Sequence, residues 1–71
     1  MARKAKRSDE YLAGVDYAHD LLAWNPDASI DDLKNEAQSG CYDMATEPHR
    51  ERKADDIYEG VCDTLAKSGR A

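Results

Sequence analysis

Two prolines, Pro26 and Pro48, divide this chain into segments in which apolar residues recur every three or four positions. Such spacing places apolar side chains on one side of an α-helix, and no segment alternates apolar and polar residues as a strand would. Proline also disfavours helical geometry in the residue before it, so Asn25 should end the first helix. The sequence therefore predicts an all-α fold, a small antiparallel bundle of three helices, long, short and long.

The first helix is expected over residues 9–24. Ser8 is followed by two acidic residues, which is typical of a hydroxyl cap with negative charges near the positive end of the helix dipole. The apolar stripe of this helix consists of Tyr11, Val15, Ala18 and Leu22. Trp24, at the end of the helix, is expected to close the bundle over the second helix.

The second helix has a clear start and two alternative ends. Ser29, with Asp32 three positions later, resembles a capping box and places the start at residue 30. Gly40 is a residue type that often follows a helix, which would give a helix over residues 30–39. The apolar spacing continues to Met44, however, which would give a helix over residues 30–45 instead. We favour a break or distortion near Gly40.

The third helix is expected over residues 47–67. Thr46 would cap it, with Pro48 in the first turn, where proline costs little. Its apolar stripe consists of Ala54, Ile57, Tyr58, Val61 and Leu65.

Each long helix carries a glycine beside its apolar stripe, Gly14 in the first and Gly60 in the third. Glycine weakens a helix by about 1 kcal/mol relative to alanine. It also lets another backbone approach closely, and tighter packing can offset the loss. We therefore predict close helix packing at both glycines, within one chain or across a dimer axis.

The chain has 71 residues and no phenylalanine, so its single helical domain, residues 8–69, has a thin core. A domain of this size buries only about 60% of the surface that its unfolded chain exposes. Association with a partner, or with a second copy in a homodimer, would add to the burial. The sequence leaves open whether the chain pairs with itself.

The net charge of −5 is unevenly distributed. The first seven residues, MARKAKR, hold four basic side chains and are expected to form a basic flexible tail. The rest of the chain has six basic and fifteen acidic residues, a balance of −9. Such a surface repels nucleic acid and anionic membranes, so the expected partner is a larger protein with a basic surface, for example one that itself binds nucleic acid.

Several function classes are disfavoured by what the sequence lacks. No apolar run is long enough for a signal peptide or a membrane span, which favours a cytoplasmic location. Cys41 and Cys62 lack CxxC spacing and are expected to be free thiols. His19 and His49 each have acidic neighbours, but zinc needs three or four converging ligands. Phosphate-binding motifs are also absent. We therefore expect no enzyme, cofactor or metal site.

The strongest candidate for a binding surface lies on the third helix, where acidic residues recur every four positions. These residues are Glu51, Asp55, Glu59 and Asp63. Like charges at this spacing oppose each other by a few tenths of a kcal/mol per pair. The arrangement becomes reasonable if a basic surface docks on it, and the alternative is a solvated face.

The first helix supplies a second candidate set, Asp16, Tyr17 and Asp20, opposite its apolar stripe. An exposed tyrosine among carboxylates would be a good anchor for a basic protein surface. The alternative is that Tyr17 covers part of another helix or a dimer seam.

Together these features predict a protein-interaction module that blocks or remodels a basic surface of its partner. In size and acidic helical composition the chain is similar to small accessory and inhibitor proteins of bacteriophages, anti-CRISPR proteins among them. That resemblance implies occlusion of a nucleic-acid-binding surface and assigns no residues. The alternative is a nucleic-acid-associated protein that uses residues 1–7 as a basic arm.

Overall fold

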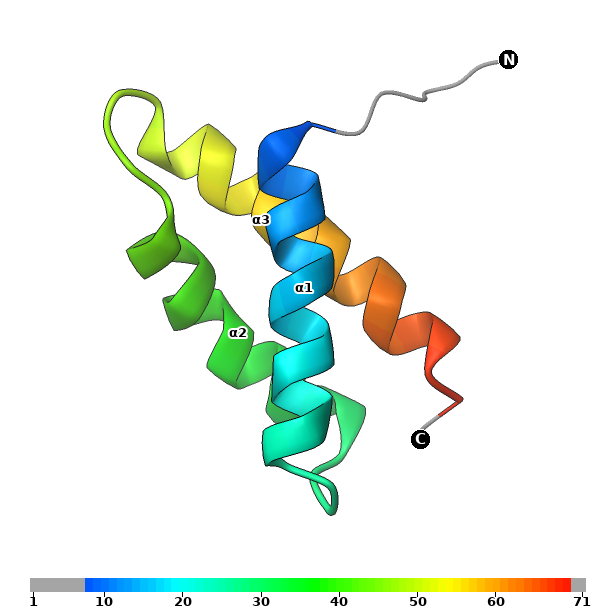
Figure 1. The fold of residues 1–71 in the computed structure, drawn as a ribbon. Helices are drawn as coiled ribbons and strands as arrows, with labels where there is room; N and C mark the ends of the chain where they lie inside the picture. Colours follow the sequence, from blue (N-terminus) through cyan, green and yellow to red (C-terminus); the bar gives the residue numbers. More distant parts are fainter. Residues whose placement is uncertain (1–7, 70–71) are drawn as a thin grey trace.

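The computed structural model describes residues 8–69, which form three α-helices and no strand (Figure 1). The helices are α1 (Asp9–Trp24), α2 (Ile30–Met44) and α3 (Arg50–Lys67). The prediction of an all-α, three-helix fold is confirmed. The predicted basic tail lies outside the described residues. No helix in the described part of the chain is both long and apolar enough to cross a membrane.

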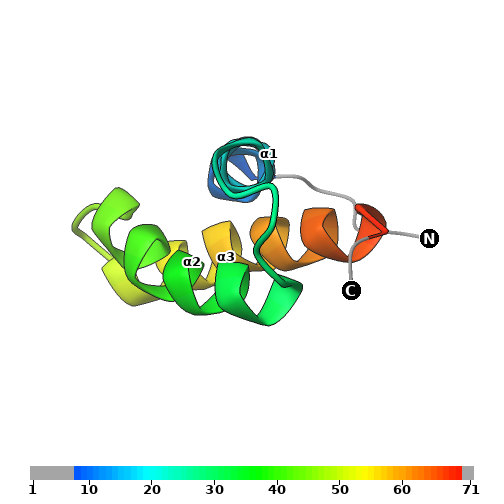
Figure 2. The ribbon, with the colours of Figure 1, turned by 90° about the horizontal axis from the view of Figure 1, so that it is seen from below.

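The helices form two layers. Figure 2 shows α2 and α3 side by side in one layer, with α1 lying across it. In Figure 1, α1 crosses α3 obliquely. The Cα trace measures 34 × 30 × 15 Å along its principal axes, so the molecule is thin in one direction. The antiparallel order of the helices stays a prediction.

The starts of the first two helices are confirmed by their caps. The hydroxyl oxygen of Ser8 accepts a hydrogen bond of 3.0 Å from the backbone N–H of Tyr11. The hydroxyl oxygen of Ser29 accepts one of 3.2 Å from the backbone N–H of Asp32. Each bond satisfies an N–H group that has no partner within its helix, which fixes where the helix begins.

The favoured break near Gly40 is wrong, because α2 continues through it to Met44. A Cβ atom at Gly40 would clash with the hydroxyl group of Tyr17 and lie 2.6 Å from Cζ of its ring. The glycine therefore makes room for a side chain of α1 rather than ending the helix. The sequence around Gly40 gives no sign of this contact, since Tyr17 is far from it along the chain.

The predicted start of the third helix is also wrong, since α3 begins at Arg50 rather than residue 47. His49 precedes it in the left-handed region, with φ at 63°, and its side chain makes no capping hydrogen bond. Thr46 is not the cap. Nε of Arg50 instead donates a 3.0 Å hydrogen bond to the carbonyl oxygen of Ala45, which closes the connection from α2 to α3.

The core contains one fully buried leucine from each helix, Leu21, Leu33 and Leu65. The other buried apolar residues are Ala18, Ala37, Cys41, Ala45, Ala54, Ile57 and Val61. On α1, the buried line runs through Gly14, Ala18 and Leu21, so the apolar stripe is rotated from the predicted one. Trp24 does not close the bundle, because 67% of its surface is exposed.

Candidate interaction surface

The two glycines of the long helices lie where α1 crosses α3. A Cβ atom at Gly14 would clash with the carbonyl oxygen of Ile57 and lie 2.8 Å from its carbonyl carbon. A Cβ atom at Gly60 would clash with the carbonyl oxygen of Tyr11 and lie 3.1 Å from its carbonyl carbon. Each glycine therefore meets the backbone of the other helix within one chain. This contact places α1 on one face of the α2–α3 layer.

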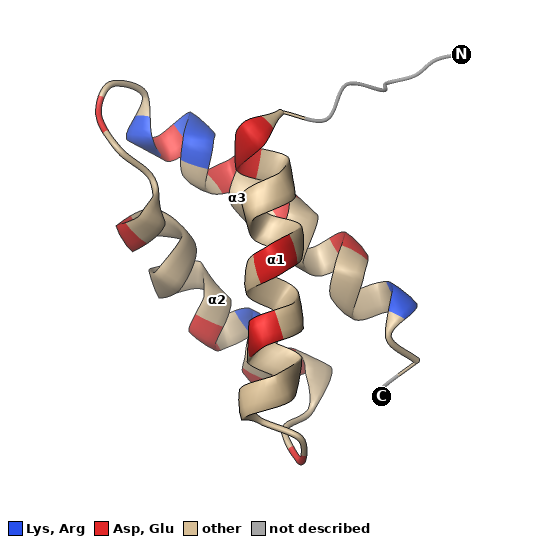
Figure 3. Cartoon of the chain, viewed as in Figure 1, with Lys and Arg blue, Asp and Glu red and all other residues tan. Residues whose placement is uncertain are grey.

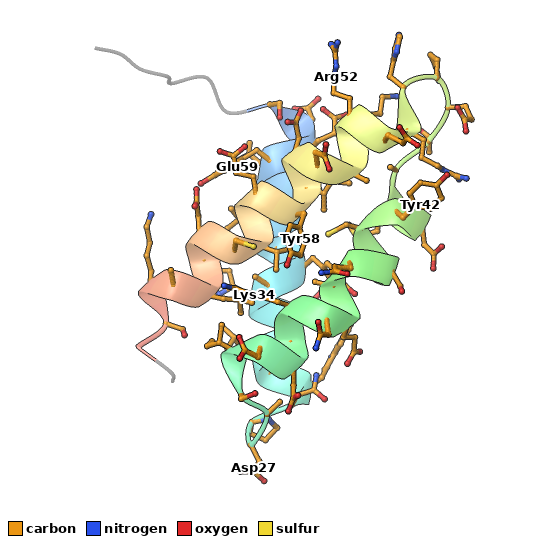
Figure 4. All side chains as sticks on the ribbon, turned by 180° about the vertical axis from the view of Figure 1, so that it is seen from behind. Asp27, Lys34, Tyr42, Arg52, Tyr58 and Glu59 are labelled. Atoms are coloured by element: carbon orange, nitrogen blue, oxygen red, sulfur yellow. The ribbon has the colours of Figure 1, made fainter. Side chains whose placement is uncertain are left out.

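The opposite face of that layer carries a groove between α2 and α3, with a volume of about 510 Å³. We call it the α2–α3 groove. It is lined by Gln38, Cys41 and Tyr42 of α2, and by Glu51, Ala54, Asp55 and Tyr58 of α3. Figure 4 shows this face, with Tyr58 between the two helices and Tyr42 near the end of α2, while α1 lies behind them.

The floor of the groove is uncharged at neutral pH. Cys41 is buried, and burial raises the pKa of its thiol to about 11, with the neighbouring thiol of Cys62 adding to the shift. Burial also raises the pKa of the Tyr58 hydroxyl, and the neighbouring thiol of Cys62 adds to the shift. A neutral floor of this kind favours contact with apolar or aromatic groups of a partner.

Charged groups line the rim of the groove. The side chains of Glu51 and Asp55 are both exposed. The guanidinium carbon of Arg50 lies 5.0 Å from the centre of the Tyr42 ring, within the usual range of a cation–π contact. The groove therefore combines aromatic rings with two carboxylates one helical turn apart, and the cation of Arg50 lies beside them.

The acidic residues predicted on α3 are all exposed, but they do not share one face. Each step of four residues turns the side chain by about 40°, so three steps turn it by about 120°. Glu51 and Asp55 line the α2–α3 groove. Asp63, at the other end, accepts a 2.6 Å hydrogen bond from the Tyr11 hydroxyl of α1. Glu59 lies on the side of α3 that faces away from α2 (Figure 4).

The acidic residues predicted on α1 lie on the other side of the molecule. Asp16 and Asp20 are exposed, whereas the buried side of α1 rests on α3. Figure 3 shows α1, with its acidic positions in red, in front of α3, and Figure 4 views the molecule from behind. Asp16 and Asp20 therefore do not share a binding surface with Glu51 and Asp55.

Tyr17 is half-buried and packs against the core, so it is not the exposed anchor considered from the sequence. The alternative, that it covers another helix, agrees with its place against Gly40 of α2. Burial raises the pKa of its hydroxyl, and Cys41, Glu36 and Asp43 raise it further.

Sequence reasoning did not single out Gln38 or Tyr42, which line the groove on α2. A pattern in the sequence does indicate these two residues. They stand four residues apart and each directly follows a buried residue, Ala37 or Cys41. This spacing places both along one edge of the buried stripe of α2.

Among residues 8–69, no three His, Cys, Asp or Glu side chains come together in a way that could hold a metal ion. Both cysteines are free thiols. Comparison with protein families, with curated proteins and with solved structures finds no match to this chain.

The neutral thiol of Cys41 predicts a loss of stability at alkaline pH. The pKa of Cys41 is about 11 in the folded chain, above its ordinary value of 9.0. The unfolded chain therefore loses this proton first, and the free energy of unfolding should fall as the pH rises from about 9 to 11. Urea unfolding at a series of pH values measures the slope. In Cys41→Ala the slope should be smaller, and equal slopes in the two proteins would contradict the assignment.

Proposed function

We propose that this protein is a small acidic interaction module that binds a basic surface of a larger protein and sterically blocks or remodels it. The observation that carries the proposal is the α2–α3 groove, which α1 leaves uncovered. Its neutral floor includes Tyr58, and its rim carries the carboxylates of Glu51 and Asp55.

The chemistry of this groove fits a basic protein surface. Aromatic side chains in a groove are common anchors of protein interfaces. Carboxylates on a rim speed the approach of a basic partner and disfavour acidic ones. Residues 8–69 contain five basic and fifteen acidic side chains, which opposes direct binding to nucleic acid. A partner that itself binds nucleic acid would present the complementary charge, and inhibition of the anti-CRISPR kind would follow from occluding that surface.

Charge reversal in the groove tests this proposal. In Glu51→Lys/Asp55→Lys, capture of the basic partner from a lysate of the native host should fall about tenfold or more, since two attractive contacts become repulsive. Capture by the wild-type protein should also weaken between 0.1 and 1 M salt, because the Debye length falls from about 10 to 3 Å. Quantitative mass spectrometry of the retained proteins measures both effects.

Asp16→Lys/Asp20→Lys is the matched control, since it reverses two exposed carboxylates at the same spacing on the other side of the molecule. It should retain the partner. Equal loss in both variants, or capture that salt does not affect, would contradict the proposal. If deletion of residues 1–7 abolished capture while Glu51→Lys/Asp55→Lys did not, the alternative of a nucleic-acid-associated protein with a basic arm would be favoured.

A homodimer is part of the proposal because the core is thin. Sedimentation analysis of the free protein should give the mass of two chains. The mass of one chain would leave the groove proposal intact and remove the dimer.

A further inference from the structure

The α2–α3 groove lies where a further helix would pack between α2 and α3. One face of the α2–α3 layer is covered by α1, and no helix within residues 8–69 covers the other (Figures 2 and 4). A groove between two helices is a common site for a third, which lays its apolar face between them. We infer that the α2–α3 groove binds an amphipathic helix of the partner that carries two basic residues four positions apart. The inference rests on the proposed function and names the form of the partner.

The spacing of the basic residues follows from the rim. Glu51 and Asp55 are four residues apart on α3, which is a rise of about 6 Å along its axis. A helix that lies alongside α3 repeats with the same rise, so its own residues at positions i and i+4 stand opposite the two carboxylates. Its apolar stripe then rests on Ala54, Cys41 and Tyr58, which line the groove.

The other charges around the groove indicate at which end of the groove the basic pair of the partner helix lies. Glu51 and Asp55 line the groove. Arg50, next to Glu51 in the chain, lies over the ring of Tyr42, and Arg52 extends away from the groove (Figure 4). Lys34 extends between α2 and α3 at the far end (Figure 4). The basic pair therefore belongs at the end of the groove near Tyr42, and a neutral or acidic residue near Lys34.

Two synthetic helical peptides of identical composition test the inference. Both have 18 residues, about 27 Å of helix, with one stripe of leucine and alanine. In the first, two arginines flank the stripe at positions i and i+4. In the second, one of these arginines is moved to the opposite side of the helix. Titration of the full chain, followed by fluorescence anisotropy, should show that the first peptide binds about tenfold more tightly.

Variants of the protein show which residues cause the difference in affinity between the two peptides. Glu51→Gln/Asp55→Gln should remove the difference between the two peptides, whereas Asp16→Asn/Asp20→Asn should retain it. Circular dichroism of the variants confirms that they fold. A preference that survives Glu51→Gln/Asp55→Gln, or no binding of either peptide, would overturn the inference.

The outcomes separate this inference from the proposed function. Equal and salt-sensitive binding of the two peptides would overturn the helical register and leave the binding of a basic partner standing. If neither peptide bound while Glu51→Lys/Asp55→Lys still lost the captured partner, the groove would take a basic surface of another form. If the captured partner were also unaffected by that substitution, both proposals would fail.

Discussion

Replacing Gly14 with alanine should destabilise the folded chain by about 2 kcal/mol. The added Cβ would clash with the carbonyl oxygen of Ile57, a backbone atom that moves only if α1 and α3 separate. Overpacking of this kind typically costs about 1–3 kcal/mol, and an obstacle made of backbone belongs at the upper end. Alanine regains about 1 kcal/mol of helix propensity, so a loss of about 3 kcal/mol at the crossing leaves a net destabilisation of about 2 kcal/mol.

Urea or thermal unfolding followed by circular dichroism measures the change. One kcal/mol shifts the melting temperature of a domain of this size by about 4–8 °C, so the effect on Gly14→Ala is large. Wild-type stability in Gly14→Ala would contradict the close approach of the two helices.

Gly40→Ala is the matched control, because it makes the same substitution in the middle of another helix. Here the added Cβ meets the hydroxyl end of Tyr17, a side chain that can rotate away. The cost of moving it is partly offset by the gain in helix propensity, so we expect a change within about 1 kcal/mol. Gly14→Ala/Gly60→Ala should cost less than the sum of its two single substitutions, since the first already separates the helices at the shared crossing.

Local rules predicted much of this fold. Ser8 and Ser29 cap their helices through bonds to residues three positions away, so a short stretch of sequence contains all the information needed. The number of helices and most of their apolar residues follow from spacing alone. The errors lie where a distant contact decides the local structure, as where Tyr17 packs against Gly40 and α2 continues.

The candidate site was harder to predict for the same reason. A run of carboxylates at four-residue spacing looks continuous in the sequence, although it turns around α3 from Glu51 in the groove to Asp63 beside Tyr11. Which of these carboxylates line the groove depends on where α1 and α2 pack against α3. Likewise, Tyr17 and Tyr42 both neighbour acidic residues in the sequence, and only packing places the first against the core and leaves the second 47% exposed.

Leu65→Ala should cost about 2–5 kcal/mol, which is the usual range for removing a buried leucine side chain. Leu65 is 0% exposed and belongs to α3, which packs against both other helices. A thin core has few other side chains that can move to fill the space. Because domains of this size have a total stability of the order of 5 kcal/mol, the variant should be largely unfolded near 37 °C. Thermal unfolding measured by circular dichroism tests this.

Leu12→Ala removes the same atoms from a residue that is 47% exposed, and should change stability by no more than about 0.5 kcal/mol. A cost for Leu12→Ala close to that of Leu65→Ala would mean that a second chain covers this part of α1. Unfolding at two protein concentrations decides between the cases, since the stability of a dimer rises with concentration and that of a monomer does not. A concentration-independent loss confined to Leu65→Ala would show that the three helices of one chain are stable by themselves.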